Sequence, residues 1–135
     1  MRDLYRACHP TWPELPGPHF YAWPTLVAIA PYPHNLVGYS SYGLNVDDNG
    51  RLAIWLKDTG VAPEVRGQGI ARELMMERLR IGREMGAGVA LGMTQPENKP
   101  MLALLHSLNF EERLRIKNAY PAGETGIFFG LGLAV

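Results

Sequence analysis

The segment that decides the fold is Val61-Ala62-Pro63-Glu64-Val65-Arg66-Gly67-Gln68-Gly69-Ile70-Ala71, which joins an apolar strand to a helix. Glycines at such a junction allow successive backbone amides to converge without obstruction by side chains. The first turn of the helix adds unpaired amide donors and a partial positive charge. Local chemistry therefore predicts a cradle for a phosphate group. The alternative at this point is a glycine-rich turn that binds nothing.

The residues after Gly69 follow a helical period. Apolar side chains recur close to one face, at Ile70, Leu74, Met75, Leu79 and Met85. Charged side chains fall mostly on the other face, at Arg72, Glu73, Glu77, Arg80 and Arg83. This pattern predicts an amphipathic helix packed on a sheet. Gly86 and Gly88 end it, with Gly86 expected in the left-handed conformation.

A second strand and helix follow this first helix. Residues 89–94 are small and apolar and predict a strand. A short helix after Pro100 is marked by Met101, Leu102, Leu105 and Leu108, with Asn109 expected as its left-handed cap. We expect two closing strands, near Glu112–Asn118 and Ile127–Val135.

The part of the chain before the junction predicts three strands, at residues 26–30, 36–44 and 51–61. Asp47-Asp48-Asn49-Gly50 is a strong hairpin turn between the second and third. Residues 1–24 are proline-rich and admit one short helix, Arg2–Cys8. The whole pattern predicts a single α+β domain over residues 1–135, with a mostly antiparallel sheet, flanking helices, a β-α-β unit and an atypical segment 1–24.

Composition restricts the possible partners. The 13 basic side chains balance the 13 acidic ones, so no bulk attraction draws the chain to nucleic acid or to an anionic membrane. Cys8 is the only cysteine and no secretory signal is evident, which favours the reducing cytoplasm. The apolar C-terminus is too short to span a bilayer as a helix. His9, His19 and His34 show no metal-ligand spacing with Cys8, so we expect no metal.

Two familiar phosphate loops do not fit. A P-loop ends in Gly-Lys-Ser/Thr, whereas Gly69 is followed by Ile70-Ala71. A dinucleotide fingerprint requires a small residue at the position of Arg72. Arg66–Ala71 after Val61-Ala62-Pro63 instead resembles the Arg/Gln-x-x-Gly-x-Gly/Ala motif of the GNAT superfamily of N-acetyltransferases. Asn98 and the later segment Leu105–Phe110, similar to the family's Tyr-x-x-Leu-Gly-Phe, strengthen the resemblance.

The resemblance implies acetyl-CoA as co-substrate and an amine as acceptor, with direct attack of the amine on the thioester. Backbone groups of Thr59, Gly60 and Val61 would pair with the pantetheine arm. Asn98 would contact the pantetheine or a nearby main chain. The pyrophosphate would be held at Arg66, Gly67, Gln68, Gly69, Ile70, Ala71 and Arg72.

The family's catalytic side chains are not recognisable in this sequence. The tyrosine that often protonates the thiolate is Leu105 here, which would offer the CoA sulfur only apolar packing, and the frequent glutamate falls at Met93. Asp58 and Tyr42 are the candidate catalytic residues, as a base and as a wall of the acceptor groove. A solvated strand-end charge and a packing aromatic are their alternatives. His106 lies about 100° around the helix from Leu105, which favours a surface position.

The missing tyrosine and glutamate leave a second function open, a catalytically silent CoA-binding or protein-interaction module. Another acyl donor is a third possibility. Release of free thiol from acetyl-CoA in the presence of an amine panel separates these. The acceptor remains open among small amines, antibiotics, peptide N-termini and protein lysines.

The N-terminal segment generates a prediction about assembly. GNAT domains usually open with a strand and two helices, for which residues 1–24 leave little room. An uncovered sheet edge invites pairing, and the segment supplies aromatic anchors at Trp12, Phe20, Tyr21 and Trp23. We expect a homodimer in which this segment or the last strand contacts the partner; folding of the segment over its own sheet edge is the alternative. Light scattering at micromolar concentration decides, because a mass of 15.0 kDa would exclude the dimer.

Overall fold

The computed structural model describes residues 24–29, 36–46 and 48–133. Its strands are β1 (Thr25–Ile29), β2 (Leu36–Val46), β3 (Leu52–Val61), β4 (Val89–Thr94), β5 (Glu111–Ile116) and β6 (Gly126–Gly132). Its helices are the 3-10 turn η1 (Pro63–Val65), α3 (Ile70–Glu84) and α4 (Lys99–Ser107). The strands form one mixed sheet in the order β1-β2-β3-β4-β6-β5.

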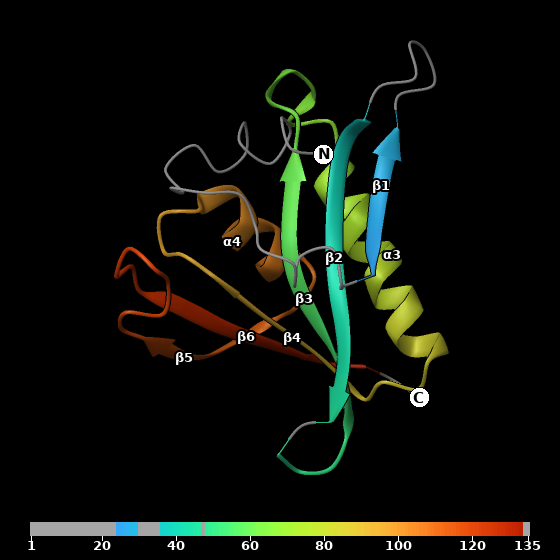
Figure 1. Cartoon of the computed structure of the whole chain (residues 1–135), viewed down its shortest axis with the longest axis vertical. Coiled ribbons are helices and arrows are strands. Elements are labelled where there is room, and N and C mark those ends of the chain that lie inside the picture. Colours follow the sequence, from blue (N-terminus) through green and yellow to red (C-terminus); the bar gives the residue numbers. More distant parts are fainter. Residues whose placement is uncertain (1–23, 30–35, 47, 134–135) are drawn as a thin grey trace. The chain divides into compact units, whose positions relative to one another are not determined.

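The chain divides into two compact parts, with boundaries inside β2, inside β3 and inside α3. In the first part, β1 and β2 pair antiparallel from Thr25 opposite Ser41 to Ala28 opposite Gly38 (Figure 1). Gly38 lies beneath the first turn of α3, where a Cβ would come 3.0 Å from Cγ2 of Ile70. The absence of a side chain at Gly38 therefore allows the helix to lie close to the strand.

The second part contains the end of β2, the start of β3, the end of α3, and β4, α4, β5 and β6. The start of β3 pairs parallel with β4, from Ala53 opposite Val89 to Leu56 opposite Gly92. β6 pairs antiparallel with β4 on one side and with β5 on the other. The parallel β3-α3-β4 step is the β-α-β unit expected from the sequence, and the fold class is confirmed.

The helix ends follow the sequence signals closely. Gly86 has φ of +85° and Asn109 has φ of +66°, so both predicted left-handed caps are confirmed. Gly50 has φ of +79°, as the predicted hairpin turn requires. Met85 was expected on the buried face of α3, but this is wrong: it lies just past Glu84 and is 57% exposed.

The expectations for residues 1–23 lie outside the described residues, including the helix Arg2–Cys8 and the aromatic anchors Trp12, Phe20, Tyr21 and Trp23. The metal expectation for His9, His19, His34 and Cys8 falls there too, or in the gap at 30–35. In the described part of the chain, the helices are too short or too polar to cross a bilayer.

One close helix–strand contact in the second part yields a prediction. A Cβ on Gly82 of α3 would come 2.8 Å from Cγ2 of Ile54, which is fully buried. Alanine favours a helix over glycine by about 1 kcal/mol, yet Gly82→Ala should destabilise the protein, because overpacking costs about 1–3 kcal/mol. Urea unfolding measures the change. Gly132→Ala is the control, since nothing lies within 4 Å of its Cβ position. A more stable Gly82→Ala protein would contradict the close contact.

Candidate functional site

The turn between η1 and α3 has the geometry of an open backbone cradle. Gly67 and Gly69 both take positive φ, +81° and +86°, a conformation that glycine adopts without strain. No atom lies within 4 Å of a Cβ position at either glycine, and the turn from Arg66 to Gly69 is exposed. The backbone of the turn is therefore accessible to a ligand.

The start of α3 supplies donors to this turn. The amide of Glu73 donates to the carbonyl of Gly69 at 3.0 Å, which makes Gly69 the first acceptor of the helix. Amides earlier in the first turn, such as those of Ile70 and Ala71, have no acceptor within the helix. They lie at the positive end of the helix dipole, where an anion is stabilised.

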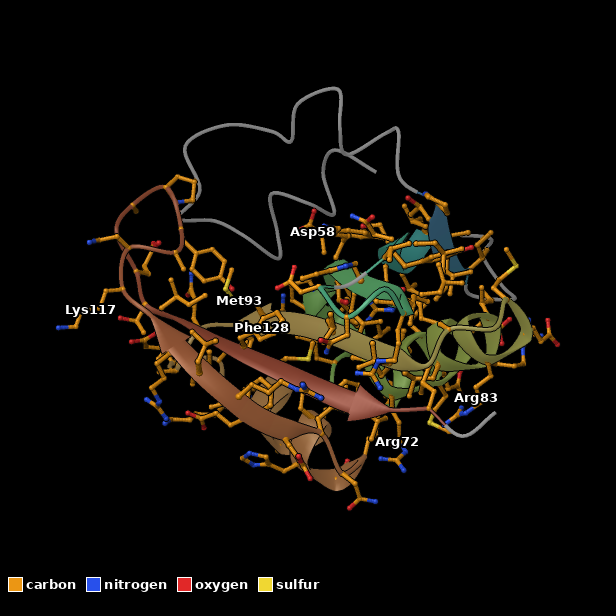
Figure 2. The ribbon with its side chains drawn as sticks, turned by 90° about the horizontal axis from the view of Figure 1, so that it is seen from below. Asp58, Arg72, Arg83, Met93, Lys117 and Phe128 are labelled. Atoms are coloured by element: carbon orange, nitrogen blue, oxygen red, sulfur yellow. The ribbon has the colours of Figure 1, made fainter. Side chains whose placement is uncertain are left out.

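Two arginines flank the cradle. Arg66 donates from Nε to the carbonyl of Val61 at 3.0 Å, so its side chain folds back onto the end of β3. Arg72 is exposed in the first turn of α3 and projects away from the ribbon (Figure 2). A cation at this end opposes the helix dipole, and an anionic ligand would relieve that repulsion. Binding of a pyrophosphate at residues 66–72 stays a prediction.

The end of β3 leads directly into the cradle. β3 continues to Val61, past the last residue that pairs with β4, Leu56. Thr59 accepts a hydrogen bond at its Oγ1 from Arg78 at 3.0 Å, and Gly60 is buried. The amide of Ala62 donates to the carbonyl of Val37 at 2.8 Å, which anchors the strand end to β2.

Sequence reasoning missed Arg78, which is only 1% exposed. It donates to the carbonyl of Ser41 at 3.1 Å, to Thr59 at 3.0 Å and to Sδ of Met75 at 3.8 Å. Burial lowers the pKa of Arg78 to about 10, although the charge of Asp58 opposes this shift. The guanidinium therefore stays protonated at neutral pH. The sequence did contain a signal for the burial of Arg78, because position 78 falls three residues after Met75 and four after Leu74 on the buried face of the helix.

The two candidate catalytic residues both lie in the first part. Asp58 is half-buried on β3, and its charge acts on Arg78. Tyr42 is half-buried on β2, and its amide donates to the carbonyl of Pro24 at 3.1 Å. Their roles in catalysis stay predictions.

The remaining predicted residues lie in the second part. Asn98 caps α4, accepting at Oδ1 from the amide of Met101 at 3.3 Å. Leu105 is 3% exposed and packs into the core beneath α4. His106 is exposed, as expected, with its ring 5.8 Å from that of Phe129. Contacts of Asn98 and Leu105 with a cofactor stay predictions.

The resemblance places the family's frequent glutamate at Met93, on the strand before Asn98. Met93 is 39% exposed and lies opposite Phe128 of β6, and the two side chains are neighbours in Figure 2. Both are apolar, so this position supplies neither a base nor a charge. Across residues 24–29, 36–46 and 48–133, no three His, Cys, Asp or Glu side chains are grouped to hold a metal ion.

A mixed six-stranded sheet flanked by helices, with a β-α-β unit opening on a glycine turn, is the fold of GNAT proteins. The model of the acetyltransferase (GNAT) family matches residues 1–110, and the chain belongs to this family. It is therefore an acetyltransferase. A search of curated proteins found no significant match.

Many solved structures share the fold. The ribosomal-protein-alanine N-acetyltransferase from Brucella melitensis is 28% identical, with 85% of this chain and 72% of that chain covered and a TM-score of 0.69. The NatC complex bound to Gag peptide and CoA is 20% identical, with 96% and 87% covered and a TM-score of 0.84. Arabidopsis thaliana NAA60 in complex with acetyl-CoA is 16% identical, with 97% and 94% covered and a TM-score of 0.78.

The burial of Leu105 generates a prediction. Leu105→Ala removes a buried side chain and should lower the free energy of unfolding by about 2–5 kcal/mol. Urea denaturation measures the loss. Leu104→Ala, on the same helix but half-buried, should cost less. Equal costs would show that Leu105 does not occupy the core position described.

Proposed function

We propose that this chain transfers the acetyl group of acetyl-CoA to a primary amine. The observation that supports the proposal is the open turn at Gly67 and Gly69, which leads into the first-turn amides of α3. A pyrophosphate carries the negative charge that such a helix start stabilises. Arg66 and Arg72 add positive charge beside it.

The pantetheine arm would lie along the end of β3. An amide-bearing chain can add to an exposed strand as another strand would, through main-chain hydrogen bonds. Thr59 and Gly60 would offer these bonds. The carbonyl oxygen of Val61 already accepts a hydrogen bond from Arg66. Val61 would therefore pair with the pantetheine arm through its amide, or through the second lone pair of that carbonyl oxygen.

The transfer would proceed by direct attack. The neutral amine nitrogen forms a bond to the thioester carbonyl carbon, and the bond from that carbon to sulfur breaks. The nitrogen loses a proton, and the departing thiolate gains one. A backbone amide near the end of β3 would stabilise the developing oxyanion. No covalent bond to the protein forms.

We propose the α-amine of a peptide as acceptor. At pH 7.5 roughly a third of such amines are neutral, against roughly one lysine side chain in a thousand. An α-amine therefore depends less on a catalytic base, and Met93 supplies none. The Brucella melitensis relative, a ribosomal-protein-alanine N-acetyltransferase, supports this choice.

Gly69→Val tests the cradle. The valine side chain should obstruct the pyrophosphate, and its strained backbone should displace the amides, weakening binding of CoA more than tenfold by calorimetry. Gly50→Val is the matched control, because Gly50 also has positive φ and open space around its Cβ position, at the β2–β3 turn. Unchanged affinity in a folded Gly69→Val protein would refute the site.

Thiol release tests the acceptor. Acetyl-CoA is supplied with a peptide that has a free α-amine, and with the same peptide α-acetylated and carrying one lysine. We expect faster release with the free α-amine and a smaller difference at pH 9.5, where more lysine is neutral. Equal rates at pH 7.5 would contradict the choice of acceptor, while no release from any amine would contradict the transferase proposal itself.

A further inference from the structure

We propose that Arg78 is a positioning residue for acetyl-CoA, holding the end of β3 in register with the phosphate cradle at the start of α3. The inference rests on the proposed function. Arg78 itself touches no cofactor group in this proposal. It acts through Thr59, whose main chain would pair with the pantetheine arm.

The contacts of Arg78 converge on the strands that support the site. Its Nη1 donates to the carbonyl of Ser41 on β2, and its Nη2 donates to Oγ1 of Thr59 on β3, at 3.1 and 3.0 Å. The guanidinium is planar, so these two bonds fix its orientation as well as its distance from each strand. Arg78 thus joins α3 to β2 and β3 at one buried point.

The need to fill space in the core does not explain why position 78 is an arginine. An apolar side chain of similar volume would fill the space without the cost of burying a charge, and such replacements often leave stability unchanged or raise it. Nε of Arg78 is buried without a hydrogen-bond partner. What an apolar residue cannot supply is the directed pair of bonds to Ser41 and Thr59.

The position of those bonds connects them to the cradle. Arg78 lies eight residues after Ile70, about 12 Å along the rigid axis of α3. From there it holds Thr59, while Arg66 in the turn holds the carbonyl of Val61 at 3.0 Å. The last residues of β3 are therefore held at two points: Arg78 of α3 holds Thr59, and Arg66 of the turn holds Val61. Losing the first bond should let Thr59 shift relative to the cradle, and a shift of about 1 Å can cost a reaction 100-fold.

Arg78→Met and Thr59→Val test the proposal in the full chain. Methionine keeps the length and flexibility to fill the space, and valine keeps the shape and main chain of threonine while removing the hydroxyl. We expect each to raise the KM for acetyl-CoA and the Kd for CoA about tenfold. The double variant should be no worse than the worse single variant, because both single variants remove the same bond between Arg78 and Thr59. Arg78→Lys should restore part of the affinity.

The controls separate positioning from stability. Arg80→Met changes an exposed arginine of the same helix, which pairs with Glu77, and should leave KM unchanged. Thermal unfolding is measured for each variant. A folded Arg78→Met or Thr59→Val protein with wild-type KM would overturn the proposal, even if its melting temperature fell. If Arg78→Met does not fold, Thr59→Val decides alone. A wild-type protein that binds no CoA would instead refute the proposed function.

Discussion

The first part of this protein depends on one buried cation. The guanidinium of Arg78 lies between α3 and the strands β2 and β3, and it hydrogen-bonds to Ser41 and Thr59. A charge with so little exposure is tolerated only where its donors are largely satisfied. The same bonds set where β3 ends relative to the helix, and the glycine turn must join these two ends. The turn thus joins two elements that one buried side chain holds together.

Both the backbone conformation and the charged side chains contribute to the turn at residues 66–72. Gly67 and Gly69 take backbone conformations that other residues adopt only with strain, and they leave the surface of the turn open. The helix start provides amides with no intrahelical acceptor, while Arg66 and Arg72 provide charge at its rim. No acid or base has to be placed there, because binding a phosphate needs only donors and positive potential. Catalytic side chains are a separate requirement, which the turn at residues 66–72 does not address.

Much of this arrangement followed from local pattern. The predicted strand at 89–94 matches β4 to the residue, and the left-handed residues Gly86 and Asn109 were expected from their places after helices. These features depend on neighbours in sequence, so periodicity and residue type report them well. Met85 was misplaced because the apolar period continues one residue past Glu84, where the helix ends. Arg78 was missed because a charged residue type argues for exposure, although its position on the helix argued for burial.

The sequence by itself determined the six strands, the helices α3 and α4, their order, and the glycine turn between β3 and α3. Helical and strand periods act over a few residues, and glycine at a positive φ is a property of one residue. Only the tertiary structure decided which polar side chain enters the core, because satisfying a buried guanidinium requires acceptors 19 and 37 residues away along the chain, at Thr59 and Ser41. It also decided how deeply Leu105 is buried. Each of these depends on which atoms the fold brings within hydrogen-bonding or packing distance, and no local pattern specifies that.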